Sequence, residues 1–180
     1  RIGALAFEGC SSLSSIKIPY SVTAIGESAF DGCSGFTSIT VEGGNSSYYD
    51  KGCAIIEAAD NRLVHGCKNT IIPDGVTSIG KWAFYNCTEP TNIIMPESIR
   101  DIEEFAFFKC TGLTGIIIPQ NTATIGKYAF YQCNRLQSVT IPAGMKSIGD
   151  GAFFECKEIG NIYSHSKRPA SIEERTFDSI

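Results

Sequence analysis

The fold is decided by a stretch that reads IGKYAFYQCNRLQSVTIP over residues 125–142. An Ile-Gly pair opens it, an Ala-Phe pair follows with a cysteine three residues later, and two aliphatic residues separated by one position lead into a proline. The same order of residue types returns every 23 positions along much of the chain. A period of roughly 20–50 residues is typical of proteins built from stacked repeats.

The phenylalanine column traces the repeat through the chain. Each of its members is preceded by alanine and followed three residues later by cysteine, and the members are Phe7, Phe30, Phe84, Phe107, Phe130 and Phe153. Isoleucine stands five residues before each of them and before Phe177. One unit of this length cannot enclose a core, whereas stacked units bury a continuous column of side chains. The pattern therefore predicts a single solenoid over residues 1–180.

Each unit is predicted to contain one strand and one helical turn. Segments such as Ile16-Lys17-Ile18 alternate apolar and polar residues, which is typical of a strand with one buried face. The proline that follows has no N–H group and ends the strand. In Gly-x-x-Ala-Phe-x-x-Cys, the apolar residues would share one face of a helical turn. The prediction is an α/β repeat solenoid, with a parallel β-sheet on one face and short helical turns on the other.

The repeat resembles a known family. The residues Ile-Gly-x-x-Ala-Phe-x-x-Cys-x-x-Leu-x-x-Ile-x-Ile-Pro, which begin here at Ile2 and with one change at Ile125, are similar to the BspA-type leucine-rich repeat. The resemblance covers most of the chain and implies a right-handed leucine-rich-repeat superhelix. Family members are typically secreted or surface-anchored proteins of mucosa-associated bacteria and some mucosal protozoa. They are implicated in adhesion, so the resemblance implies an extracellular or cell-surface location, a host or microbial surface protein as partner, and no catalytic residues.

The period breaks between Phe30 and Phe84, which lie 54 residues apart. At about residues 42–70 we expect an irregular hairpin insertion, with strands at Cys53–Glu57 and Arg62–Cys67. This hairpin is expected to protrude from the solenoid and not to form a separate domain.

Composition excludes several classes of function. The chain has 180 residues, 19 acidic and 15 basic side chains, and a formal net charge of −4. It lacks the Lys/Arg cluster of a nucleic-acid-binding protein or a polybasic anchor. No apolar run approaches the roughly 18–20 residues that span a bilayer, so no membrane insertion is expected within this segment. Because the chain opens inside one unit and stops just after Phe177, we expect a fragment of a longer array, with any signal peptide or anchor outside it.

The cysteines and histidines offer little chemistry. Six of the eight cysteines follow the repeat and are interpreted as a ladder of buried, inert thiols. Cys53 and Cys67 flank the hairpin, and either a disulfide, which would fit an oxidising compartment, or two free thiols are compatible with the sequence. His65 could share a strand face with Cys67, but a surface histidine beside a structural cysteine is favoured because no third orienting group is found. The remaining histidine, His165, lies in another irregular segment.

Neither an enzyme nor a metal site is expected. No two cysteines lie closer than 14 positions, which does not match the spacing of a metal site. The carboxylate pairs Glu103-Glu104 and Glu173-Glu174 are interpreted as solvated loops and not as acid–base dyads. The sequence therefore predicts no catalytic residue and no cofactor.

The strand face is the first surface that could bind a partner. One residue per strand is predicted to point outward between the two buried aliphatic residues, and the column comprises Lys17, Thr40, Ile94, Ile117, Thr140 and Tyr163. Two adjacent exposed isoleucines would indicate a partner surface. The alternative is that flanking loops cover them.

Aromatic residues mark a second surface on the outer wall. They stand two positions before and one position after the core phenylalanines, and they are Trp82, Tyr85, Phe105, Phe108, Tyr128, Tyr131 and Phe154. We call this set the aromatic stripe. Either its rings pack between neighbouring turns and shield the wall, or they form a docking stripe for a protein or a glycan.

Two functions remain. The first is a non-catalytic cell-surface or secreted module for protein recognition or adhesion, to host matrix or between cells. The alternative is a glycan-binding or cell-wall-associated module that uses the aromatic stripe. A fold alone does not decide between them.

Overall fold

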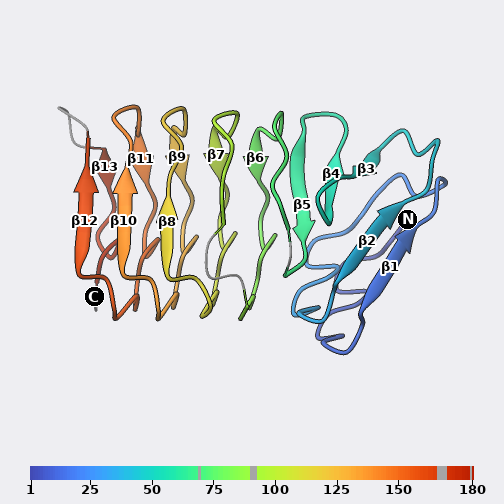
Figure 1. Cartoon of the computed structure of the whole chain (residues 1–180), viewed down its shortest axis with the longest axis horizontal. Helices are drawn as coiled ribbons and strands as arrows, with labels where there is room; N and C mark the ends of the chain where they lie inside the picture. The colour runs from blue at the N-terminus through green and yellow to red at the C-terminus, as the bar shows by residue number, and fades with distance from the viewer. Residues whose placement is uncertain (69, 90–92, 166–169, 179) are drawn as a thin grey trace.

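The computed structural model describes residues 1–68, 70–89, 93–165, 170–178 and 180, which form a solenoid of short strands stacked along one long axis (Figure 1). Its strands are β1 (Ser15–Ile18), β2 (Ser38–Val41), β3 (Tyr48–Asp50), β4 (Ala54–Glu57), β5 (Arg62–Gly66), β6 (Ser78–Ile79), β7 (Asp101–Ile102), β8 (Gly115–Ile117), β9 (Thr124–Ile125), β10 (Ser138–Ile141), β11 (Ser147–Ile148), β12 (Asn161–Ser164) and β13 (Ser171–Ile172).

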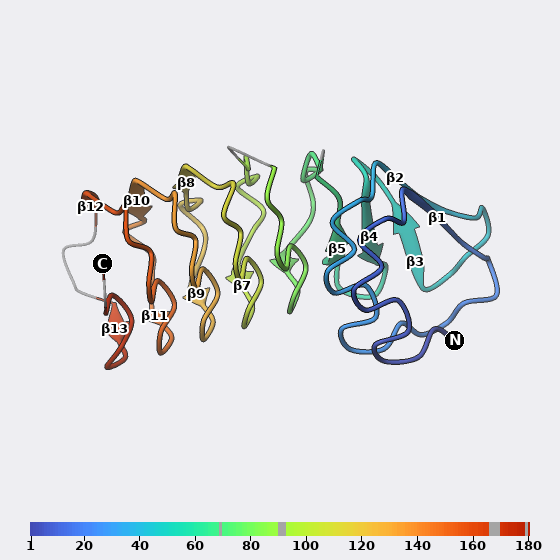
Figure 2. The ribbon, with the colours of Figure 1, turned by 90° about the horizontal axis from the view of Figure 1, so that it is seen from below.

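These strands form three sheets. One pairs β1 with β2, a second has the order β12-β10-β8, and the third has the order β13-β11-β9-β7-β6-β5-β4-β3. Figure 2 shows the first two sheets along one side of the solenoid, with β7, β9, β11 and β13 on the opposite side. All pairings are parallel apart from β3 with β4 and β4 with β5.

The predicted strand is confirmed before Pro19, Pro119 and Pro142, and it pairs in register with its equivalent 23 residues away. Before Pro96 it is not, because residues 93–95 form no strand. Ile16 lies opposite Ile39 in one sheet, and Val139 lies opposite Ile116 in another. A second strand per unit was not predicted. From Ile79 onward it contains the isoleucine that stands five residues before the phenylalanine, so that Ile102 pairs with Ile125 in the third sheet. In the first two units the equivalent Ile2 and Ile25 form an isolated parallel bridge.

The predicted helical turns are wrong, because the described residues contain no helix. Around each phenylalanine the backbone takes a positive φ two residues before and two residues after it, as at Tyr128 (53°) and Gln132 (54°). A left-handed residue ends a right-handed helical turn, so the segment becomes two successive tight turns. Alternate N–H groups then point along the solenoid axis, and Phe130 donates to the carbonyl of Ala152 at 2.8 Å.

The hairpin does not protrude. β4 and β5 are antiparallel, and β5 continues the third sheet by pairing with β6. The strands separate two hydrophobic cores, because Ala54, Ile56 and Leu63 pack into the carboxy-terminal core while Ile55 packs into the amino-terminal one. The irregular segment is therefore a partition between two stacks of repeats.

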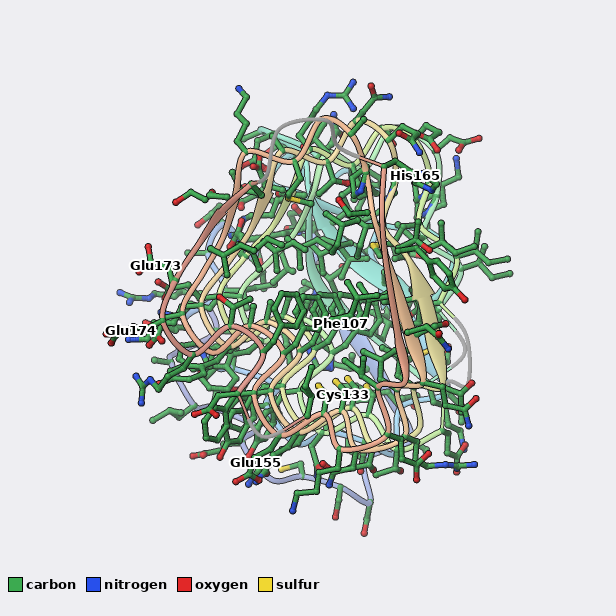
Figure 3. All side chains as sticks on the ribbon, turned by 90° about the vertical axis from the view of Figure 1, so that its left-hand side faces the viewer. Phe107, Cys133, Glu155, His165, Glu173 and Glu174 are labelled. Carbon is green, nitrogen blue, oxygen red and sulfur yellow. A yellow bond between two sulfur atoms is a disulfide. The ribbon has the colours of Figure 1, made fainter. Side chains whose placement is uncertain are left out.

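The phenylalanine column fills the carboxy-terminal core. Phe84, Phe107, Phe130 and Phe153 are at most 1% exposed, and their rings stack with centroids 5.0 Å apart. Figure 3 looks along this stack and shows Phe107 at its centre, with Cys133 beside it in a row of sulfur atoms. The alanine before each of these phenylalanines is also fully buried, and its small side chain lets the turns approach the column closely.

Candidate recognition surfaces

Two apolar residues of the predicted strand face are exposed to solvent. Ile94 is 84% exposed and Ile117 is 75% exposed, so loops among the described residues do not cover them. Thr140 on β10 lies between Ile117 and the exposed Tyr163, because it pairs with one of them on each side. A shallow hollow of about 540 Å³ adjoins this row, and Ile94 and Ile117 both line it.

A third isoleucine belongs to this face and was missed in the sequence. Ile71 stands 23 residues before Ile94, is followed two residues later by Pro73, and is 75% exposed. The period measured backward from Ile94 could have found it, because Ile71 lies just beyond the irregular segment of about residues 42–70. We call Ile71, Ile94 and Ile117 the isoleucine row.

The aromatic stripe forms two lanes of stacked rings. Trp82 stacks on Phe105 with centroids 4.2 Å apart, and Phe108 stacks on Tyr131 at 4.5 Å. Edge contacts join the lanes, as between Trp82 and Tyr85 at 5.3 Å. All seven rings are half-buried, and neighbouring rings cover much of their flat faces. This geometry favours the interpretation in which the rings shield the wall.

One lane of the stripe lacks a ring at Gly151. Tyr128 leans into the space, where a Cβ atom on Gly151 would clash with its ring. Arg175 occupies the same position one unit later, donates to the hydroxyl of Tyr128 at 3.1 Å and pairs with Asp150 at 2.7 Å. A hollow of about 320 Å³ remains between the lanes, bordered by Tyr131 and Phe154 among others.

The cysteines of the repeat occupy the turn wall. Five are buried and Cys10 is exposed. The thiols of Cys33, Cys110, Cys133 and Cys156 each donate to the carbonyl of a phenylalanine in the preceding unit, at 2.8–3.2 Å. Burial raises the pKa of Cys33 to about 11, which keeps that thiol protonated and unreactive.

The two remaining cysteines lie in the partition. Cys53 and Cys67 are joined in a disulfide, with Cα atoms 5.8 Å apart. Cys67 packs in the amino-terminal core and Cys53 against it. The bond therefore closes the base of the β4–β5 hairpin.

His65 is not on the surface, contrary to the sequence prediction. Its ring packs 5.5 Å from Phe30 and 5.8 Å from Phe36, which lie far from it in sequence. Burial lowers the pKa of His65 to about 4, so the ring is neutral at pH 7. His165 is exposed and lies across the molecule from Glu173 and Glu174 (Figure 3).

The carboxylates of Glu103 and Glu104 turn to different partners. Glu103 accepts a hydrogen bond from the amide of Lys81 at 3.0 Å and lies 3.8 Å from Arg62, whereas Glu104 pairs with the Lys81 amine at 3.5 Å. Within the described ranges, no group of three His, Cys, Asp or Glu side chains could hold a metal ion.

A family model described as the BspA type leucine rich repeat region, with six copies, matches residues 1–54 and 64–180. The chain belongs to the BspA-type leucine-rich repeat family. No match is found among curated proteins.

Several solved structures are similar to this chain in fold. A leucine-rich cell surface protein from Faecalibacterium prausnitzii is 27% identical, with a TM-score of 0.66 over 92% of this chain and 51% of that chain. A leucine-rich repeat protein of T. pallidum is 28% identical, with a TM-score of 0.61 over 95% of this chain and 65% of that one. The pneumococcal vaccine antigen PcpA, at 18% identity and a TM-score of 0.63 over 87% of this chain and 46% of that one, is similar in fold. This chain thus spans about half to two thirds of the length of these structures.

As a BspA-type repeat array, the described part of the chain presents sheet faces and a turn wall. In that part the structure has no helix with the length and apolar character needed to cross a membrane.

Proposed function

We propose that this chain is a non-catalytic recognition module of a secreted or cell-surface protein, and that it binds a protein partner through the isoleucine row. The observation that carries the proposal is the exposure of three large aliphatic side chains at equivalent positions, Ile71, Ile94 and Ile117. Exposed apolar patches of this kind on soluble proteins mark interaction sites, since water disfavours them.

The surroundings of the row suit a protein partner. The same column carries polar residues toward both ends, Lys17 and Thr40 before the row and Thr140 after it. An apolar centre with a polar rim is the usual anatomy of a protein–protein interface. Large side chains at the centre supply most of the binding energy in such interfaces.

The cell-surface location and the adhesive role also belong to this proposal. They are supported by family membership and by the names of similar structures, one of which is a leucine-rich cell surface protein. Adhesion to host matrix or between cells is the specific form of recognition that we propose.

The test measures binding of the immobilised chain to a panel of purified extracellular matrix proteins. The double variant Ile94→Ser/Ile117→Ser should weaken binding by about tenfold or more, as expected for the loss of central apolar contacts. Its melting temperature should stay close to that of the parent chain, because both side chains are exposed. Tyr20→Ser is the matched control, since Tyr20 is 64% exposed and stands outside the column. Unchanged binding by the double variant would refute the role of the row.

A glycan-binding role for the aromatic stripe has one observation in its favour, the hollow bordered by Tyr128, Tyr131 and Phe154. A glycan array separates it from the first proposal. Substitution of Tyr85, Phe108 and Tyr131 by serine should abolish glycan binding with little change in melting temperature if the stripe is a docking site. If no glycan binds and the triple variant loses much of its stability, the rings instead have a structural role in packing the turn wall.

A further inference from the structure

The two stacks of repeats meet at a seam between the unit of residues 25–33 and strand β5. Between consecutive units elsewhere, the turn wall is a ladder in which N–H groups of one unit donate to carbonyl groups of the next. In the first pair, the amides of Leu5, Phe7 and Gly9 donate across the ladder at 3.1, 2.8 and 2.7 Å. Later units donate in the same direction, as from Phe84 to Ala106 and from Asn86 to Phe108, both at 2.8 Å. In two of these units the first of the three amides, at Trp82 and at Gly151, has no acceptor among the described residues.

The ladder stops at one side of the seam. The corresponding amides of residues 25–33 belong to Ser28, Phe30 and Gly32, and among the described residues none of the three has a hydrogen-bond acceptor. On the other side of the seam, the first unit of the second stack is hydrogen-bonded to β5, because the amide of Gly66 donates to the carbonyl of Ala83 at 3.0 Å. The first stack therefore ends in an edge of unpaired donors, spaced two residues apart as in an exposed strand.

A cavity of about 360 Å³ lies against this edge. Residues 25–31 line it on one side, and Arg62, Val64, His65, Lys81 and Glu103 line it on the other. His65 is 5% exposed, and its Nε2 has no hydrogen-bond partner in the described part of the chain. A buried polar atom without a partner is costly, and such atoms are rare in folded proteins. A ligand that supplied partners to His65 and to the edge would remove this cost.

The charges around the cavity do not select an ion. Lys81 pairs with Glu27 at 3.0 Å, and Arg62 lies 3.8 Å from Glu103. These pairs offset one another, and the carboxylate of Asp31 leaves one negative charge in the lining, which repels an anion. The unpaired amides are donors and offer a cation no ligand. A neutral ligand with carbonyl acceptors at regular spacing fits the unpaired amides better.

We propose that the seam cavity binds a short extended peptide segment of a partner protein, whose carbonyl groups accept hydrogen bonds from the amides of Ser28, Phe30 and Gly32. An extended peptide that pairs with an exposed edge obtains its affinity from main-chain hydrogen bonds. The neutral His65 ring meets the peptide backbone at Nε2. This site goes beyond the isoleucine row and does not depend on it.

The test uses acetyl-trialanine N-methylamide as the probe and records amide signals of the ¹⁵N-labelled chain. The probe should shift the signals of Ser28, Phe30 and Gly32, and it should slow their hydrogen exchange by roughly tenfold as they become paired. Sodium acetate and methylammonium chloride, at the same concentration, should leave these signals in place. An equal response to acetate would overturn the proposal in favour of an anion site, and no response to the peptide would overturn it outright.

Variants make the test specific. Val64→Trp fills the cavity and should abolish the response, whereas Thr40→Trp places the same side chain on the exposed strand face and should retain it. If Val64→Trp disturbs folding, His65→Phe removes Nε2 while keeping a ring, and should weaken the response severalfold. Ile94→Ser/Ile117→Ser should keep the full response, so a failure of the isoleucine row and a failure of the seam site are distinguishable. A full response from both cavity variants would refute the proposed location.

Discussion

His65 should make the stability of the chain depend on pH between about 4 and 6.5. The pKa of the buried ring is lowered from 6.5 to about 4, so the unfolded chain binds a proton more readily than the folded chain in this interval. Its contribution to stability is complete above pH 6.5 and is lost as the pH falls. The loss amounts to about 2 kcal/mol at pH 5 and about 3 kcal/mol at pH 4.

Titration of Asp31 changes stability in the opposite direction to His65 over the same pH interval. Asp31 therefore has to be replaced before the contribution of His65 can be measured. Burial, with repulsion from Glu8 and Glu27, raises the pKa of Asp31 to about 6. The folded chain therefore prefers the protonated acid, and this preference costs stability as the pH rises from 3.8 through 6. In the Asp31→Asn background, the free energy of unfolding should fall by about 2 kcal/mol between pH 8 and pH 5 because of His65.

The assay is urea unfolding at pH 5, 6, 7 and 8, followed by the fluorescence of Trp82, the single tryptophan. Adding His65→Leu to Asp31→Asn should remove this pH dependence. It should leave stability at pH 8 unchanged or higher, because an unpartnered buried nitrogen is lost. His165→Leu is the control and should change nothing, since His165 is exposed. Identical pH profiles with and without His65 would refute the reasoning.

Three further predictions concern the core and the cysteines. Phe107→Ala should lower the free energy of unfolding by about 3–5 kcal/mol in urea titrations, because its buried ring stacks on both sides; a loss below about 1 kcal/mol would contradict this packing. Cys53→Ser/Cys67→Ser should cost about 3 kcal/mol by the same assay, since the disulfide closes a separation of 14 residues, and a neutral effect would argue against the bond. Alkylation of the native, unreduced chain followed by mass spectrometry should label Cys10 within minutes and spare the buried thiols, whereas uniform labelling would disprove their burial.

The stacking of the repeats could be predicted because a fixed period specifies which residues become axial neighbours. Once Phe107 and Phe130 occupy the same place in consecutive units, their side chains must meet. The same argument predicted the exposure of Ile117, which points outward on β8 between two buried residues. Ile94 is exposed at the equivalent position although residues 93–95 form no strand. Whether loops would cover them depended on other segments, and only the structure answers that.

The turn wall could not be predicted from the spacing of Ala, Phe and Cys, because a helical turn and two tight turns both place residues three apart on one side. The deciding feature is a positive φ at Tyr128 and its equivalents, and the residue types there include Leu, Ser, Trp and Phe. None of these marks a left-handed backbone as glycine does. The burial of His65 could not be predicted for a different reason. Phe30 and Phe36, which cover its ring, are distant in sequence and outside its repeat, and only the folded chain brings them together.

The partition made by β4 and β5 bears on how the array responds to tension along its axis. The two cores share no continuous interior across it, and Ile55 and Ile56 anchor neighbouring residues of one strand in different cores. Rupture of the amino-terminal core would therefore leave the stacked phenylalanines beyond the partition in place. Several such modules joined end to end would unfold under tension in separate steps, because each partition would stop unfolding from spreading to the next core.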